Sequence, residues 1–291
     1  MLPGVWQYLV SGLTVGASYG LTALGFTMIV NTTGIINFAQ GEFVMLGGML
    51  SVAMFKAGLP LPLAIVAAVA VTALVGALTW HGLIRPVAKS AAVNLIIITI
   101  GVSILIRGAV MLIWGKDTFS LPAFSGVKPL MFLGAALQPQ SLWVLSVMLL
   151  VLTGLKVFLS RSIHGKAMLA CACQAKAARL VGISVECMAM VSFGLSGLVG
   201  ALGGAILTPI TLTSYDVGMM LGLKGFAAAV LGGLGNPYGA AAGGLILGVL
   251  ESYGAGYVSS AYKDAFAFIV LLLLLFIKPT GLFGAAKSER V

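Results

Sequence analysis

The stretch WQYLVSGLTVGASYGLTALGFTMIV, at residues 6–30, contains no charged side chain. A helix needs about 20 apolar residues to cross the hydrocarbon core of a bilayer, so this stretch is long enough to span a membrane. No positively charged region precedes it, and its apolar run is too long for the core of a secretory signal peptide. The stretch therefore predicts a first transmembrane helix and not a cleaved leader.

The composition extends this conclusion to the whole chain. Of its 291 residues 60% are hydrophobic and only 8% are charged, and the mean hydropathy is +1.14. Typical globular domains contain about 25% charged residues, so this chain lacks the charged surface that a large soluble protein needs. Long uncharged stretches, such as those from Lys56 to Arg85 and from Glu186 to Asp216, recur along the chain. The composition predicts an integral membrane protein.

Breaks at proline, glycine and charged residues divide the chain into a series of expected helices. These cover residues 6–30, 38–56, 61–84, 93–114, 141–160, 188–208, 219–234, 240–256 and 264–278. The expected fold is all-α, a polytopic transmembrane helical bundle that forms a single domain over residues 1–291. The segments 219–234 and 240–256 are short, and the turn GGLGNPYG at 232–239 joins them tightly, so one segment is a candidate for a broken or re-entrant element. Eight or nine membrane segments are expected.

Lysine and arginine gather in alternate loops, which sets the expected orientation. One set of loops carries Arg85, Lys89, Lys156, Arg161, Lys166, Lys176, Arg179, Lys278, Lys287 and Arg290. The other set carries Lys56, Lys116, Lys128 and Lys263. Because cytoplasmic loops hold the excess of basic residues, the loop at 161–187 and the C-terminus are predicted to be cytoplasmic, and the N-terminus to lie outside. The net charge of +9 reflects this bias, since the basic residues are too dispersed for a nucleic-acid-binding surface.

Small residues recur at four-residue spacing within three of the expected helices. The series are Gly12, Gly16 and Gly20; Ser196, Gly200 and Gly204; and Ala240, Gly244 and Gly248. Small residues at this spacing let helix backbones approach closely in a membrane, where no hydrophobic force distinguishes a helix from lipid. They predict tight helix packing.

One loop is longer than the others and reads SRSIHGKAMLACACQAKAARLVGISVECMAM at 160–190. Its centre, residues 168–180, is rich in alanine, lysine and glutamine and predicts a short helix that ends at Gly182, with Arg179 in its last turn. Such a helix is too polar to insert, so it is expected to dock on the inner face of the bundle or on a cytoplasmic partner. The loop also holds or adjoins Cys171, Cys173 and Cys187, which are expected to be reduced thiols; their spacing does not predict a metal site.

Four stretches of the sequence resemble one protein family. They are GIINFAQGEFVMLGGML at 34–50, QAKAARLVGISVECMAMVSFGLSGLVGALGG at 174–204, GLKGFAAAVLGGLGNPYGAAAGGLILGVLES at 222–252, and KPTGLFG at 278–284. In this order they resemble the LivH-like permease subunits of branched-chain amino acid ABC importers. The family usually has histidine where this chain has Gln40, which removes an imidazole that titrates near neutral pH but keeps hydrogen-bonding capacity.

This resemblance implies a bacterial inner-membrane protein with a periplasmic N-terminus and several partners. The implied partners are a second, M-type permease subunit, two cytoplasmic ATPase subunits and a periplasmic substrate-binding protein. The resemblance makes the long loop the coupling element that contacts an ATPase, through Gln174, Ala175, Ala178, Arg179, Leu180 and Gly182. No phosphate-binding G-x-x-x-x-G-K-[ST] motif occurs in the chain, so ATP and Mg²⁺ are expected on the partner ATPases, with no cofactor in this subunit. No catalytic motif is present either, and the chain is not expected to be an enzyme.

Four polar residues in apolar surroundings are candidates for the translocation path or its gate. Asn37, Gln40 and Glu42 lie within a few residues of each other, and unpaired polar groups are costly in a membrane unless they face the bundle interior or water. Two interpretations are open, an interhelical hydrogen-bond cluster and the lining of the path. Lys224 either extends to the outer interface or attracts a carboxylate at the outer mouth. Arg107 is expected to extend to the outer interface. Glu251 and Asp264 are expected at the ends of the last outer loop, either solvated or in contact with a binding protein.

Alternative functions remain at this stage. Relatives of this kind carry amides, urea or aromatic acids, and the sequence does not separate these substrates from branched-chain amino acids. An ion-coupled secondary transporter predicts several buried acidic residues and an internal repeat, of which only Glu42 is a candidate here. A membrane scaffold without transport would leave the INFAQGE stretch unexplained. The H-type resemblance favours a heterodimeric permease core.

Overall fold

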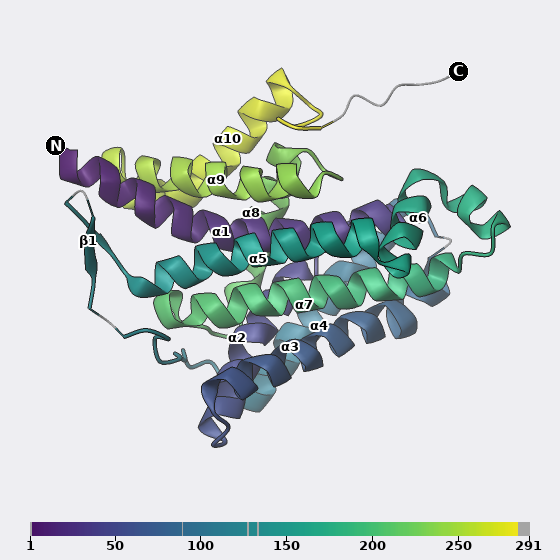
Figure 1. Cartoon of the computed structure of the whole chain (residues 1–291), viewed down its shortest axis with the longest axis horizontal. Helices are drawn as coiled ribbons and strands as arrows, with labels where there is room; N and C mark the ends of the chain where they lie inside the picture. Colours follow the sequence, from purple (N-terminus) through teal and green to yellow (C-terminus); the bar gives the residue numbers. More distant parts are fainter. Residues whose placement is uncertain (1, 89, 127, 133, 285–291) are drawn as a thin grey trace.

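The computed structural model describes residues 2–88, 90–126, 128–132 and 134–284. Lys89, Lys287 and Arg290, which enter the orientation argument, lie outside these residues. The described chain is a helical bundle with ten α-helices, labelled in Figure 1. Their bounds are α1 Leu2–Thr33, α2 Gln40–Lys56, α3 Leu61–Leu78, α4 Ala92–Trp114, α5 Pro139–Arg161, α6 Ile163–Leu180, α7 Val185–Thr211, α8 Val217–Gly232, α9 Pro237–Tyr257 and α10 Lys263–Ile277.

Helix α1 occupies the centre of the bundle. It lies between α9 on one side and α5 and α7 on the other (Figure 1). Of its most apolar window 83% is buried inside the chain, and 67% of the α7 window, against 22% in α3, α4 and α5 and 6% in α10. The poorly buried helices turn exposed leucine, isoleucine and valine outward, as expected for helices that face lipid or other subunits.

Six helical segments among the described residues are long and apolar enough to cross a membrane. They are α1, α3 with its continuation to Val87, α4, α5, α7, and α10 together with the turn before it, from Ser260 to Ile277. The short α8 and α9 meet the same test only as a pair, which is bent by 118°, and counting this pair as one span gives seven. Helix α2 has 17 residues and is too short to cross alone. The structure therefore confirms a polytopic α-helical bundle, whereas the expected eight or nine segments are not confirmed.

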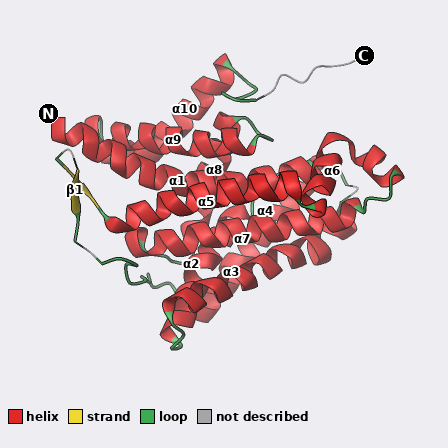
Figure 2. Cartoon of the chain, viewed as in Figure 1, coloured by secondary structure: helices red, strands yellow, loops and turns green. Residues whose placement is uncertain are grey.

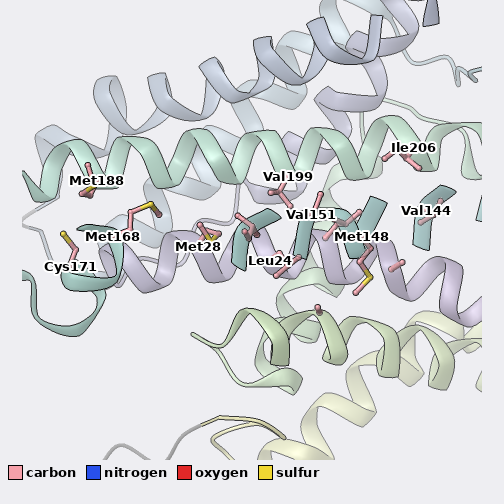
Figure 3. Close-up of a cluster of buried hydrophobic side chains, with 14 of the residues drawn as sticks. Leu24, Met28, Val144, Met148, Val151, Met168, Cys171, Met188, Val199 and Ile206 are labelled. Atoms are coloured by element: carbon pink, nitrogen blue, oxygen red, sulfur yellow. The ribbon is translucent and has the colours of Figure 1, made fainter. Parts of the chain in front are cut away.

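The largest apolar cluster lies where α1, α5 and α7 meet and continues to α6. Figure 3 shows Leu24 and Met28 of α1 facing Val151 of α5 and Val199 of α7. At one end of the cluster Met168 and Cys171 fasten the first part of α6 against the bundle. Four of the labelled side chains are methionine, whose flexible chain fills irregular gaps between helices.

A small β-hairpin that the sequence did not predict lies between α4 and α5 (Figure 2). Its strands, β1 Leu130–Phe132 and β2 Ala135–Leu137, have three residues each, too few for a periodic pattern. The amide of Ala136 donates to the side-chain oxygen of Gln7 at 2.8 Å, which ties the hairpin to α1.

Short helical turns complete the chain. Helix α3 continues as a π-helical turn, Thr79–Ile84, and a 3₁₀ turn, Arg85–Val87, and a second 3₁₀ turn, Ser260–Tyr262, precedes α10.

Candidate functional site

The first candidate site residues lie in a break between α1 and α2. Helix α1 ends at Thr33, and residues 34–39 run in a non-helical conformation before α2 begins at Gln40. Gly34 has φ +71°, which places it in the left-handed region that favours glycine. The amide of Phe38 donates to Thr99 Oγ1 of α4 at 3.2 Å, and the amide of Ala39 donates to Asn37 Oδ1 at 3.1 Å. Side chains thus replace part of the helical hydrogen bonding that the break removes.

Gln40 joins three helices in the interior of the bundle. Its side-chain nitrogen donates to the carbonyl oxygen of Ser196 in α7 at 3.2 Å, and its side-chain oxygen pairs with the Ser196 hydroxyl. The same hydroxyl lies 3.0 Å from the carbonyl oxygen of Gly25 in α1. Since Gln40 is fully buried, its placement matches the interhelical hydrogen-bond interpretation.

Glu42 is buried with only half of its carboxylate paired. Its Oε1 accepts a hydrogen bond of 2.8 Å from Ser103 of α4. Its Oε2 has no hydrogen-bond partner among the described residues, and neither does the buried Nδ2 of Asn37. A Cβ atom at Gly218, in the first turn of α8, would lie 2.5 Å from Oε2, so a larger residue there would collide with the carboxylate. Such unpaired buried polar groups are costly. Two of the three found among the described residues lie at this junction, and the third is Glu251 Oε2.

Helix α4 carries a stripe of polar side chains, of which the sequence analysis named only Arg107. Thr99, Ser103 and Arg107 follow one another at four-residue spacing, which places them on one face of the helix. Thr99 binds the amide of Phe38, Ser103 binds Glu42, and Arg107 Nη1 donates to Met219 Sδ of α8 at 3.3 Å. The four-residue spacing in an otherwise apolar helix was the available signal.

The stripe borders an open pocket between α4 and α8. The volume of this pocket is about 320 Å³. Its polar lining is Ser103 and Arg107, and its apolar lining includes Phe38. We call the contacts of residues 37–42 with α4 and α8, together with this pocket, the α2–α4–α8 junction.

Lys224 lies in a different place from the other three candidate residues. Its Nζ pairs with Glu251 of α9 at 2.9 Å and with Asp264 of α10 at 2.5 Å, and it donates to Tyr19 Oη of α1 at 3.2 Å. Lys263 pairs with the same Glu251 oxygen at 3.3 Å. The expectation of solvated ends is wrong for Glu251, which is 1% exposed, because the two lysines compensate its charge inside the bundle.

The long polar loop forms a helix that begins earlier than expected and is broken in the middle. Helix α6 starts at Ile163, and Gln174 has the non-helical angles φ −158° and ψ 98°. At its end Gly182 has φ +86°, its amide donates to Arg179 O, and the amide of Ile183 donates to Ala178 O. These two bonds form the glycine-terminated helix end that the sequence predicted.

The break leaves the end of α6 accessible. Ala178 is buried, whereas Leu180 is 90% exposed and Val181 75% exposed. Gln174 and Arg179 are also exposed, and Ala175 is half-buried.

The predicted glycine series lie at close helix contacts. A Cβ atom at Gly12 would lie 2.7 Å from Val249 Cα, and one at Gly16 would lie 2.8 Å from Gly244 O, so this series packs on α9. Gly20 packs on Ala241 and on Met148 of α5. Gly200 and Gly204 of α7 face α2, and Gly244 and Gly248 of α9 face the α1 series.

In the described part of the chain, no group of three or more His, Cys, Asp or Glu side chains is placed to hold a metal ion.

Comparison with known proteins gives a consistent picture. The sequence profile of the family described as branched-chain amino acid transport system, permease component, matches residues 8–275. The chain is 35% identical to the high-affinity branched-chain amino acid transport system permease protein LivH of Escherichia coli K12, over 98% of this chain and 97% of that protein. It is 34% identical to the corresponding permease protein BraD of Pseudomonas aeruginosa, over the full length of both.

A solved structure shares the fold. A chain of PsaBC from Streptococcus pneumoniae, in complex with Fab, superposes with a TM-score of 0.50 at 15% identity, over 94% of this chain and 92% of that one.

Proposed function

Since the chain belongs to the family of permease components of branched-chain amino acid transport systems, it is a multi-pass membrane transport subunit and not an enzyme, and we propose that its α2–α4–α8 junction forms this subunit's wall of the translocation path. The observation that carries the proposal is the pair of unsatisfied buried polar atoms, Asn37 Nδ2 and Glu42 Oε2, at the junction. Buried polar groups in membrane proteins are costly and usually pair with each other or face a water-filled cavity, so unpaired ones indicate a solute pathway.

The helix ends at this junction support the same assignment. Both α2 and α8 begin there, and Gly41 and Gly218 let the two helices touch. Helices that start within a membrane protein expose free backbone groups, which transporters use to contact polar solutes. In this proposal Gln40 fastens α2 to α1 and α7, while Asn37 and Glu42 face the path. Lys224 is left out of the path and holds α10 to the bundle.

The exposed end of α6 supports an ATPase contact. We assign the coupling role to Gln174, Ala175, Ala178, Arg179, Leu180 and Gly182. Leu180 and Val181 project an apolar surface next to the basic Lys176 and Arg179, and nothing in the described chain covers them. An exposed apolar patch with a charged rim is typical of a protein interaction site. ATP-driven closure of two partner ATPases, which hold ATP and Mg²⁺, would move this element and rock the glycine-packed bundle as a rigid body.

The rest of the proposed assembly follows from the family. A second, M-type permease subunit completes the path, and a periplasmic binding protein delivers the substrate. The N-terminus is periplasmic and the coupling loop and C-terminus are cytoplasmic, following the basic residues. In this arrangement α2, α8 and α9 are the partial or paired elements that raise the segment count to eight or nine. The names of LivH and BraD favour branched-chain amino acids over amides, urea or aromatic acids as the substrate.

Purification of the tagged chain in mild detergent tests this proposal. We expect a second permease and ATPase subunits to co-purify, and the complex with its binding protein to take up radiolabelled leucine in proteoliposomes only with ATP. A chain that purifies alone and transports under an ion gradient would replace the proposal with the secondary transporter. ATP-dependent uptake of an amide, urea or an aromatic acid in place of leucine would change the substrate alone.

Two variants of α6 test the coupling element. Leu180→Glu places a charge on the exposed end and should abolish ATPase co-purification and uptake. Ile163→Glu is the matched control, since Ile163 is 83% exposed at the other end of the same helix. Ala178→Pro, which breaks the helix, should abolish uptake while insertion into the membrane persists. Normal uptake by an inserted Leu180→Glu variant would remove the coupling role.

A further inference from the structure

The pocket between α4 and α8 combines two kinds of lining. We infer that it binds the zwitterion of an apolar α-amino acid, with Arg107 receiving the carboxylate and the Ser103–Glu42 pair receiving the ammonium group. The inference rests on the proposed transport function, and it adds the residues that contact the substrate and select its chemical class. The volume of the pocket, about 320 Å³, lies at the lower end of the range for small-molecule pockets.

The positive end of the pocket is a guanidinium group without a carboxylate partner. No ion pair within the described ranges includes Arg107, and the hydrogen bond that its side chain makes there is to the thioether of Met219. A thioether is a weak acceptor, whereas guanidinium matches a carboxylate with two parallel hydrogen bonds. The group is therefore available for the carboxylate of a solute.

The negative end is the carboxylate of Glu42, reached through Ser103. No lysine or arginine of the described chain forms an ion pair with Glu42, although it is 1% exposed. Ser103 lines the pocket and donates its proton to Glu42 Oε1, so its oxygen lone pairs remain free to accept from an ammonium group. A cation at this point would also compensate the buried carboxylate.

The spacing of the two ends suits a small zwitterion. Ser103 and Arg107 are four residues apart on α4, which places them about 6 Å apart along the helix. An α-amino acid carries its two charged groups on one carbon, so it can bridge this gap with both groups hydrogen-bonded. The remaining lining is apolar, with Phe38, Ile100, Ile104, Met219 and Leu223 placed to contact an aliphatic side chain.

A glycine in the pocket wall, Gly222, lets α2 and α8 approach closely. A Cβ atom at that position would lie 3.2 Å from Gly41 Cα. The backbones of α2 and α8 can therefore meet behind the pocket and close its inner side.

The test uses the co-purified complex in proteoliposomes with saturating binding protein and radiolabelled leucine. Arg107→Gln should lower the uptake rate about tenfold or more, because a hydrogen-bonded charge is lost, and Arg107→Lys should restore part of it. Ile104→Trp should fill the pocket and block uptake. Leu105→Trp is the matched control, since Leu105 is the next residue, 64% exposed, and does not line the pocket.

A labelling experiment reports on occupancy without transport. Ile104→Cys should react with N-ethylmaleimide in the complex, and leucine should slow the reaction. Isoamylamine, which is leucine without its carboxylate, should not slow it, and Arg107→Gln should remove the protection by leucine.

The outcomes separate the inference from the proposed function. No ATP-dependent uptake by the unchanged complex would reject the proposed function itself. Robust uptake that survives both Arg107→Gln and Ile104→Trp would overturn the inference alone and assign the pocket to lipid. Loss of the second permease from the Ile104→Trp complex would also overturn it and make the pocket a contact between subunits.

Discussion

Ser103 of α4 donates a hydrogen bond of 2.8 Å to Glu42 of α2, although 61 positions separate them in the chain. This contact sets the position of the buried carboxylate between two helices that otherwise touch little. It also ties the break before α2 to the polar stripe of α4. The coupling between these two side chains is therefore the most direct measure of whether the α2–α4–α8 junction forms as described.

The first prediction is that Ser103→Ala and Glu42→Gln are not additive. A hydrogen bond to a charged group contributes about 1.5–3 kcal/mol, so a double-mutant cycle should give a coupling energy of about 1 kcal/mol or more. Thermal unfolding of the purified protein in detergent measures it. Ser51→Ala paired with Glu42→Gln is the control and should be additive, because Ser51 bonds to the Gly47 carbonyl of its own helix. Additivity in both pairs would contradict the contact.

The second prediction concerns the packing of α1 on α9. Gly16→Leu should lower the free energy of unfolding by about 1–3 kcal/mol or more, because a Cβ atom there would lie 2.8 Å from Gly244 O and 2.9 Å from Leu245 Cα. Gly154→Leu in α5 is the matched control, since a Cβ atom there meets nothing within 4 Å. The melting temperature of each variant is compared with that of the unchanged protein. Equal shifts for Gly16→Leu and Gly154→Leu would argue against the close helix contact.

The third prediction contrasts a buried ion pair with an exposed one. Lys224→Met leaves the buried Glu251 with Lys263 as its remaining ion-pair partner and Tyr19 as a hydrogen-bond donor, and removal of one member of a buried pair costs about 3–5 kcal/mol. Arg85→Met breaks the pair with Glu186, whose side chains are 48% and 55% exposed, and should cost below about 1 kcal/mol. Melting temperatures of the two variants test this order, and the reverse order would reject the structural role of Lys224.

The fourth prediction concerns thiol reactivity in the α6 region. Burial raises the pKa of the Cys171 thiol, and Arg179 offsets this only in part. Because the thiolate is the reactive form, Cys171 should react with maleimide about tenfold or more slowly than the exposed Cys173 and Cys187, and its rate should rise with pH. Single-cysteine variants labelled at neutral pH measure the rates.

Two controls complete this experiment. In denaturing detergent the three thiols should react alike, and equal rates in the folded protein would contradict the burial of Cys171. A membrane-impermeant maleimide should reach Cys173 and Cys187 only in inside-out vesicles, if the loop is cytoplasmic as proposed. Labelling from the other side would invert the proposed orientation.

Local sequence features predicted the secondary structure well where they were sufficient by themselves. Long uncharged runs such as residues 6–30 became helices, and Gly182 ended α6, because both depend on a few neighbouring residues. The three-residue strands of the hairpin were missed for the same reason, since a pattern needs more residues than they contain. The break at Gln174 has no counterpart in the sequence that we could identify.

The candidate site was predicted only in part. Asn37, Gln40 and Glu42 were identified because polar residues are conspicuous in an apolar run. The sequence could not tell that Gln40 binds Ser196 while Glu42 binds Ser103, because both partners lie on distant helices. Lys224 was grouped with these three, although its side chain contacts α1, α9 and α10 and not α2 or α4. Its partners Glu251 and Asp264 are brought to it by the packing of α9 and α10.

The sequence by itself determined that this protein is a polytopic helical membrane protein and indicated its resemblance to one family of transport subunits, because hydropathy and local motifs depend on neighbouring residues. Only the tertiary structure decided which polar side chains meet. Close glycine contacts bring α8 to the start of α2, the Ser103–Glu42 hydrogen bond joins α4 to it, and no local pattern encodes either contact. In a membrane protein the hydrophobic residues point outward as well as inward, so the polar contacts between helices carry the specificity that the hydrophobic pattern lacks.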